Sequence, residues 1–475
     1  MITWVVIMFV AFFSLLMLAS VKSYQKNRSS QEFMLAGSNL GVFLGFMTFS
    51  AALFSAFTFQ GMPDFFRQNG IGAWIFLAFS DGAMVFFILW FGRKLRRKAR
   101  EKGFKGVAGL MTECYGTRWA GYALFFSSFL FLIPYAAIQI RGISVFFDAA
   151  FPQFLPRWGW SLILVVLMIL YAEIGGFKAM VYSDAIQGTI LLVVLWLIAG
   201  TCIHKLGGLQ SMFDQVAAAE EQLLSCPGPN KLFNWQFLLG SLIAVVMIPV
   251  TQPQMTTRLV VMKNLRAMKK MAYAVGIFAI LVIMATIFIG MYGAVRYPAA
   301  TAQEFWSKAL LYDQLAPVAG LAMVGLFAAC LSTTNSQIFA LGNELRSMLP
   351  GHEKRVMFIT KIFLFIFAIL VMIFASLMGD QIALLARVSF TGTAMIAPIV
   401  LSGVISRHKP GKELIVISFI ALAVFLASIA GLVPSQVGPL QLDILLYLFT
   451  FGATAISLLV RRYADGKRPD ALTTQ

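Results

Sequence analysis

Charged residues are scarce in this 475-residue chain: Asp, Glu, Lys and Arg together make up 12%, whereas soluble proteins have about 25%. Hydrophobic residues make up 60%, and the mean hydropathy is +0.83. These proportions exclude a soluble globular protein. They indicate an all-α protein embedded in the lipid bilayer, because a membrane-spanning helix needs roughly 20 largely apolar residues.

Cysteine and histidine are also rare, with four and three residues, and their spacing matches no metal-binding cluster. We find no nucleophile–base pairing and no phosphate-binding loop, so we expect no enzyme. Cys202 and Cys226 both fall near the predicted outer side and could form a disulfide in an oxidising compartment. The net charge of +17 does not indicate nucleic-acid binding, because the basic residues alternate from loop to loop.

About thirteen apolar stretches are long enough to cross the membrane. The first has no basic segment before it and no small-residue cleavage site, so we interpret it as a retained span and not as a signal peptide. The predicted spans are 2–21, 41–66, 71–92, 119–149, 160–174, 182–205, 236–262, 271–296, 314–341, 356–377, 380–405, 413–431 and 441–460.

Positive charge marks alternate connections between these spans. By the positive-inside rule, the basic connections are cytoplasmic. We therefore expect a multi-pass protein of the cell (inner) membrane, acting as a monomer, with its N-terminus outside and its C-terminus in the cytoplasm. The basic segments are 22–28, 93–105, 258–270, 346–361, 407–412 and 461–468.

Two predicted spans look interrupted. The second contains Gly41, Gly45, the small-residue patch Ser50-Ala-Ala52 and Gln60-Gly-Met-Pro63, and the seventh contains Ile248-Pro-Val-Thr-Gln-Pro-Gln254. Broken helices at membrane depth are tolerated where they line a cavity. The two lie five spans apart, which predicts two inverted five-helix repeats, at about 41–205 and 236–405, within one transporter domain. Paired breaks of this kind indicate the binding site of a secondary transporter. Ordinary kinked helices are the alternative. The flanking helices are 2–21, 413–431 and 441–460.

Small and hydroxyl-bearing residues cluster in the ninth span. Ala329, Ser332 and Thr333 share one helical face, and Ser332, Asn335 and Ser336 repeat the pattern. Hard cations prefer several oxygen ligands, and such a face supplies hydroxyls and accessible carbonyls. The hydroxyls could instead bond to carbonyls of their own helix, or the small residues could pack helices together.

The break in the second span would free carbonyls such as those of Ala51 and Phe54 to face this cluster. Polar side chains nearby suit a small polar organic solute: Ser55, Thr58, Gln60, Tyr135 and Gln139. Arg141 and Arg387 could each bind a carboxylate or reach the membrane interface.

Asp184 lies near the cytoplasmic end of the sixth predicted span, where an ionisable residue is costly and is by default a candidate functional residue. It could bind a cation, pair with Lys178 or contact water at the membrane edge.

Several segments resemble the sodium:solute symporter family, which includes bacterial proline, pantothenate, sialic acid and sugar transporters. They are Phe33-Met-Leu-Ala-Gly-Ser38, the break ending in Gly61-Met-Pro63, Tyr171-Ala-Glu-Ile-Gly-Gly-Phe-Lys-Ala179 with Tyr182-Ser-Asp-Ala-Ile-Gln187, and Ala328-Ala-Cys-Leu-Ser-Thr-Thr-Asn-Ser336. The resemblance runs from about residue 30 to about 405. It implies a five-plus-five inverted repeat like that of the bacterial leucine transporter.

The resemblance also implies ion ligands. The main sodium site would be Ala51, Phe54, Ala329, Ser332 and Thr333, the first three through their carbonyls. Asp184, Asn335 and Ser336 match a second sodium site that some members have, with Asn335 at a position where those members can have a hydroxyl. Tyr135 stands where sialic acid transporters have an arginine. Leu53 and Phe57 replace an acid and a tryptophan of the proline transporters.

The sequence therefore predicts sodium-coupled symport of a small polar organic solute by alternating access. A proton-coupled transporter of the same architecture is one alternative, in which Asp184 would titrate. A transporter-like sensor is the other, and the chain ends about fifteen residues after the last predicted span, leaving no room for an output domain.

Overall fold

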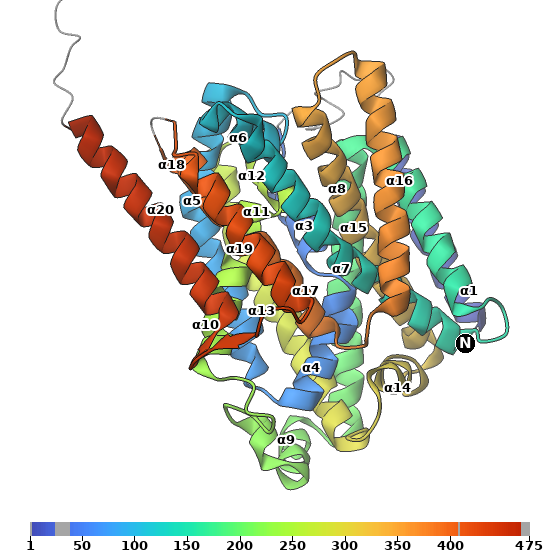
Figure 1. Cartoon of the computed structure of the whole chain (residues 1–475). Helices are drawn as coiled ribbons and strands as arrows, with labels where there is room; N and C mark the ends of the chain where they lie inside the picture. Colours follow the sequence, from blue (N-terminus) through green and yellow to red (C-terminus); the bar gives the residue numbers. More distant parts are fainter. Residues whose placement is uncertain (1, 24–38, 407–408, 467–475) are drawn as a thin grey trace, which may run out of the picture.

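The computed structural model describes residues 2–23, 39–406 and 409–466, and the side chains of 19–23, 168–176 and 462–466 are outside this description. The basic segment 22–28 and the motif 33–38 thus fall almost wholly outside it. The described chain is a bundle of long helices running between two ends (Figure 1). Helices dominate because a lipid-embedded backbone must satisfy its polar groups internally.

The first half of the bundle contains one broken helix and two long ones. The elements are α1 (Ile2–Ser23), α3 (Val42–Leu53), η2 (Phe57–Gly61), α4 (Met62–Asn69), η3 (Ile75–Phe79), α5 (Ser80–Lys102), α6 (Val107–Tyr115), α7 (Arg118–Ala150), α8 (Arg157–Lys205), α9 (Leu209–Ala219) and η4 (Glu221–Leu224). Both η2 and η3 are π-helical turns, which often mark functional sites.

The second half contains two further broken helices and a two-stranded antiparallel hairpin. The elements are α10 (Trp235–Val246), α11 (Ile248–Thr251), α12 (Pro253–Val260), α13 (Leu265–Arg296), α14 (Ala302–Ser307), η5 (Lys308–Tyr312), α15 (Ala316–Met348), α16 (Glu353–Leu377), α17 (Ile382–Ala394), α18 (Ala397–Ile405), α19 (Glu413–Ile429), β1 (Gln436–Val437), β2 (Leu440–Gln441) and α20 (Leu442–Gly466).

Among the described residues, seven helices are long and apolar enough to cross a membrane, or ten if each bent pair counts as one span. Three shorter apolar helices, Ile2–Leu18, Arg157–Leu167 and Glu413–Ile429, fall on other predicted spans. The positions of the predicted spans thus agree with helices. The count of thirteen crossings and the inverted repeat stay predictions.

Both predicted helix breaks are present. The axis bends by 62° between Val42–Leu53 and Phe57–Asn69, and by 54° between Trp235–Thr251 and Pro253–Val260. Phe54 and Gln252 adopt extended backbone conformations at these points. Proline explains the second break, because Pro253 has no N–H to continue the helix. A third bend of 44°, between Ile382–Ala394 and Ala397–Ile405, was not predicted.

α8 was predicted as two spans, 160–174 and 182–205, but the structure describes one helical element. Its two ends nevertheless contact one short segment: Arg157 donates to Gln303 at 3.3 Å, and the Lys205 ammonium lies 3.8 Å from the Asp313 carboxylate. A straight helix of 49 residues would be about 73 Å long. The parts before Leu167 and after Phe177 are therefore two arms with ends on the same side of the molecule.

The bundle has two opposite ends, which we name after helices that lie there. The α14 end carries α9, α14 and the N-terminal end of α1, and the α6 end carries α6 and the C-terminal end of α20 (Figure 1). The basic C-terminal turns of α5 lie at the α6 end, where Lys98 donates to the Ser406 carbonyl. The basic residues of α5 thus lie at the end predicted to be cytoplasmic, and the orientation in the membrane itself stays a prediction.

α15 is the central helix. It contacts α8, α7, α1, α3, α12 and α6, and nearly all of its residues between Ala319 and Leu345 are buried. Its glycine at 325 permits a close approach, because a Cβ there would lie 3.1 Å from a methyl of Val194 on α8. The predicted hydroxyl cluster is therefore in the interior of the bundle, beside the break in α3.

Candidate ion and solute site

The break after α3 leaves backbone groups without helical partners, and α7 supplies partners for them. The Tyr135 hydroxyl donates to the Leu53 carbonyl at 3.0 Å, and the Ala56 N–H donates to the Gln139 amide oxygen at 2.9 Å. Both side chains are fully buried. An unpaired buried backbone group is costly, so this pair of side chains stabilises the broken conformation.

The five residues predicted to contact the solute are brought together around this break. The Gln139 amide donates to the Ser55 hydroxyl at 3.2 Å, and the Ser55 N–H donates to the Thr58 hydroxyl at 3.1 Å. The Gln60 amide donates to the carbonyl of Gly142, where a Cβ would lie 2.4 Å from the Gln60 oxygen. All five are thus engaged with one another or with backbone.

The predicted main sodium ligands also converge. The hydroxyls of Ser332 and Thr333 lie 2.9 Å and 3.3 Å from the Ala51 carbonyl oxygen. Ser332 also lies 2.9 Å from the Ala329 carbonyl of its own helix, the bonding pattern of the alternative interpretation. Phe54 follows directly after α3, at the extended residue of the break. Hydrogen bonds thus connect four of the five predicted oxygens, those of Ala51, Ala329, Ser332 and Thr333, and such a group of oxygens fits a hard cation.

Asp184 lies one helical turn from this cluster, toward the α6 end. Its carboxylate accepts a hydrogen bond from the Thr48 hydroxyl at 2.5 Å and forms an ion pair with Arg258 at 3.1 Å. Both charged side chains are almost completely buried, with 0% and 1% of their side-chain surface exposed. Asp184 thus pairs with Arg258 and not with the suggested partner Lys178. From the sequence, Arg258 was assigned to a basic cytoplasmic segment.

Arg258 lies in α12 and its guanidinium is fully hydrogen-bonded within the protein. It donates to the Ser336 hydroxyl at 2.7 Å, to the Gln254 carbonyl at 2.8 Å, and to the carbonyl and hydroxyl of Thr48 at 2.9 and 3.0 Å. Assigning it to a loop was wrong, because the break at Pro253 turns α12 back into the bundle. The predicted span 236–262 already contained this residue, which was the available signal.

Two of the three predicted second-site residues, Asp184 and Ser336, therefore contact the same cation, and that cation is the guanidinium of Arg258. The third, Asn335, is buried, and its amide oxygen has no partner within the described part of the chain. A guanidinium is planar and permanently charged. Arg258 thus supplies positive charge at the place where the resemblance implied a second sodium ion.

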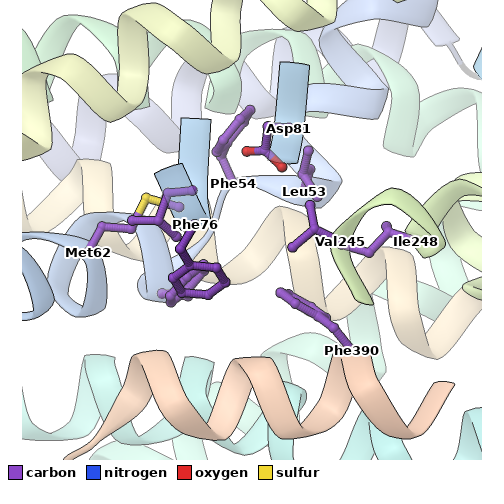
Figure 2. Close-up of a pocket in the computed structure, with 10 residues that line it drawn as sticks. Leu53, Phe54, Met62, Phe76, Asp81, Val245, Ile248 and Phe390 are labelled. Atoms are coloured by element: carbon purple, nitrogen blue, oxygen red, sulfur yellow. The ribbon is translucent and has the colours of Figure 1, made fainter. Parts of the chain in front are cut away.

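Asp81 is an acid that the sequence analysis did not single out. It is 6% exposed and faces a small cavity beside the break, together with Leu53, Phe54, Val245 and Phe390 (Figure 2). Met62, Phe57, Phe76, Leu77 and Ile248 complete the lining. The signal was available, because an acid within the predicted span 71–92 is a candidate functional residue by the same rule that selected Asp184.

Contacts between separate elements close the α14 end. Arg141 of α7 pairs with Asp380, just before α17, at 2.9 Å, and Arg67 of α4 donates to the Tyr297 and Pro298 carbonyls at 3.0 and 3.2 Å. The Asp64 carboxylate pairs with Arg67 within α4. Gly61 allows the closure, because a Cβ there would lie 2.8 Å from Ile382 of α17. Arg141 thus has an acidic partner, and so does Arg387, which lies 2.6 Å from Asp443.

Cys202 and Cys226 do not form the disulfide considered from the sequence: Cys202 is buried, Cys226 is exposed, and both are free thiols. No group of three or more His, Cys, Asp or Glu side chains within the described ranges could hold a metal ion.

Comparisons with known proteins agree with this architecture. A family model described as the sodium:solute symporter family matches residues 33–410. The chain is 25% identical over 389 residues to a sodium/pantothenate symporter of Haemophilus influenzae, covering 78% of this chain and 76% of that one. It is 23% identical to a sodium/proline symporter of Staphylococcus saprophyticus, covering 83% and 80%.

A solved structure of a sodium-coupled sialic acid symporter, described as substrate-bound and outward-open, has a similar fold. Its TM-score is 0.77 at 15% sequence identity, with 96% of this chain and 97% of that chain covered. This similarity shows that the two chains share a fold.

Proposed function

Because the chain belongs to the sodium:solute symporter family, we propose that it imports a small polar organic solute across the cell membrane, driven by one sodium ion per cycle. Its relatives carry pantothenate or proline, and its structural neighbour carries sialic acid. They do not agree on one solute. The relatives therefore support the coupling ion and the mechanism, and they do not specify the solute.

The observation that carries the proposal is the approach of Ser332 and Thr333 to the Ala51 carbonyl at the helix break. These oxygens come from two different helices, α3 and α15. A sodium ion bound between them would hold the two helices together through the hydroxyl and carbonyl oxygens, replacing the hydrogen bonds that Ser332 and Thr333 now donate to the Ala51 carbonyl. Ion binding is thereby linked to the shape of the break, which is the physical basis of coupling.

Alternating access would follow from opening the two closures in turn. At the α14 end, the Arg141–Asp380 ion pair joins α7 to the start of α17, and Arg67 joins α4 to the Tyr297 and Pro298 carbonyls. At the α6 end, the Asp184–Arg258 pair lies between the sodium cluster and the cytoplasmic end proposed from the basic segments. The predicted sites lie between these closures, as a midplane site requires.

The stoichiometry of one rests on Arg258. A sodium ion at Asp184 and Ser336 would have to displace a guanidinium that makes five hydrogen bonds there. One sodium ion crossing 100 mV supplies about 2.3 kcal/mol, or roughly fifty-fold accumulation of a neutral solute at 1.4 kcal/mol per factor of ten. A sodium concentration gradient adds to this.

The test is uptake into proteoliposomes with an inward sodium gradient, compared with liposomes in which potassium replaces sodium on both sides. The solute panel should include L-proline, pantothenate, sialic acid, glucose, choline and glycine betaine. We expect uptake of at least one solute that requires sodium, with a Hill coefficient for sodium near one. Uptake that is equal in potassium and follows the pH gradient would instead support the proton-coupled alternative.

A further inference from the structure

Asp81 presents a carboxylate to an apolar cavity without any partner. It lies in the first turn of α5, and the structure gives its carboxylate no hydrogen bond and no ion pair within the described residues. By contrast, Asp64, Asp184, Asp380 and Asp443 all pair with arginines. A buried charge is costly unless it is paired. Asp81 is thus suited to a partner that arrives from outside the protein.

The rest of the cavity limits what that partner can be. All other lining side chains are apolar, and they include the rings of Phe54, Phe57, Phe76 and Phe390 (Figure 2). A hard metal cation needs several oxygen ligands, whereas this cavity offers the side-chain oxygens of one carboxylate. An organic cation has no such requirement. Its charge can meet the carboxylate while its alkyl groups contact the rings, and aromatic faces attract ammonium groups directly.

We propose that the transported solute carries an alkylated ammonium group, that Asp81 binds this group, and that Phe54, Phe57 and Phe390 surround its alkyl substituents. The inference rests on the proposed symport function and specifies the solute. It covers quaternary ammonium compounds and alkylated amines, including zwitterions whose carboxylate lies elsewhere.

The cavity adjoins the sodium cluster along the chain. Leu53 and Phe54 line the cavity, and Ala51, two residues earlier, supplies the carbonyl that approaches Ser332 and Thr333. The Tyr135 hydroxyl holds the Leu53 carbonyl, and its ring packs edge-on against Phe390 at 5.1 Å. Sodium binding at the break therefore acts on the same residues that form the ammonium cavity.

The space between these side chains amounts to about 20 Å³ in the closed structure, room for a single water molecule. An alkylated ammonium group needs more, so ring movement must accompany its entry. Phe390 is placed to move, because it lies on α17, which is bent by 44° from α18, and its ring meets Phe57 edge-on at 6.4 Å. Movement of α17 would widen the cavity without disturbing Asp81 on α5.

The decisive comparison uses two probes of the same shape. Choline and its uncharged carbon isostere, 3,3-dimethyl-1-butanol, are compared in sodium, together with glycine betaine, L-proline, glucose and lactate. Thermal unfolding of the purified protein reports binding, and proteoliposome uptake reports transport. We expect at least one ammonium compound to bind and be transported in a sodium-dependent manner, and the isostere, glucose and lactate to have no effect.

The variant Asp81→Asn should then raise the half-saturating concentration of that compound at least tenfold while keeping stabilisation by sodium, which shows that the protein folds. Asp148→Asn is the matched control, because Asp148 pairs with Arg157 at the α14 end, away from the cavity. Its uptake should equal that of the parent protein.

Three results would overturn the inference. One is the absence of binding and transport for every ammonium compound. Another is equal competition by the isostere, and the third is an unchanged half-saturating concentration in Asp81→Asn. Sodium-driven uptake of glucose or lactate alone would overturn it while leaving the proposed symport intact. Loss of sodium dependence for every solute would instead refute the symport function itself.

Discussion

Replacing Arg258 with glutamine tests the role of the buried ion pair directly. The substitution removes the partner of Asp184 and five hydrogen bonds to α3, α12, α8 and α15. Removing one partner of a buried ion pair lowers the free energy of unfolding by about 3–5 kcal/mol, because the remaining charge is left without compensation. We therefore expect Arg258→Gln to be less stable than the parent protein by about this amount when potassium replaces sodium.

Sodium should restore part of this loss. In the variant, Asp184, Ser336 and Asn335 offer oxygen atoms that the guanidinium no longer occupies, and a cation that binds only the folded state stabilises it. At a sodium concentration one hundred times its dissociation constant, the gain is about 2.7 kcal/mol. The assay is thermal unfolding in detergent across a sodium titration, with the Hill coefficient of sodium-dependent uptake as a second measurement. The coefficient should rise from about one toward two.

The double variant Asp184→Asn with Arg258→Gln is the matched control. It removes both charges, so it should be more stable than Arg258→Gln alone and should show no additional sodium response. The reasoning would be refuted if Arg258→Gln responded to sodium as the parent does and the double variant were as unstable as the single one. Asp184 would then have no need of a cation.

Three further predictions concern the surrounding residues. Ser332→Ala combined with Thr333→Ala should raise the half-saturating sodium concentration severalfold in uptake assays, and an unaltered value would assign both hydroxyls to helix packing alone. Gln139→Ala should lower thermal stability by about 1–3 kcal/mol, because the Ala56 N–H loses its buried acceptor; equal melting temperatures would contradict this. Glu344→Gln should lower the free energy of unfolding by about 2–3 kcal/mol. The two carboxylate oxygens of Glu344 accept hydrogen bonds from the Val107 N–H at 2.9 Å and the Ala108 N–H at 2.6 Å, and the amide nitrogen would replace one of these acceptors. Glu344→Asp, measured in the same melting assay, keeps the negative charge and shortens the side chain, so it tests whether the carboxylate must extend to the N–H groups of Val107 and Ala108.

Local sequence signals predicted the helix breaks and the hydroxyl face well. Pro253 removes a backbone donor at the second break. The first break lies at Phe54, after the small-residue patch Ser50-Ala-Ala52, whereas Gly61 and Pro63 lie in the helical turns that follow it. The shared face of Ser332 and Thr333 follows from helical periodicity. Their approach to Ala51 follows only from the packing of α15 against α3, which helical spacing alone does not give. The family resemblance supplied that pairing as an expectation.

Three features were not predicted from the sequence: the buried position of Arg258, the role of Asp81 as a candidate site residue, and the third bend. Arg258 was counted as a loop charge because positive residues follow it, although the break at Pro253 directs its helix inward. Asp81 was passed over, even though an acid in an apolar span is costly. The third bend, between Ala394 and Ala397, has Gly392 and Pro398 beside it, a weaker version of the signal used at the other breaks.

The number of charges moved in each cycle links these sites. A transporter with two sodium sites moves two positive charges with a neutral solute. In the proposed cycle with one sodium ion, Arg258 takes the place of the second ion but cannot cross the membrane, so the electrical contribution of that ion is lost. A solute with a net charge of +1 bound at Asp81 would restore it: two charges crossing 100 mV give about 4.6 kcal/mol, or roughly 2,000-fold accumulation. A zwitterionic solute adds no net charge, so its uptake would be driven only by the electrical free energy of the one sodium ion. Because Arg258 stays in the protein, strong accumulation therefore favours a cationic solute over a zwitterion.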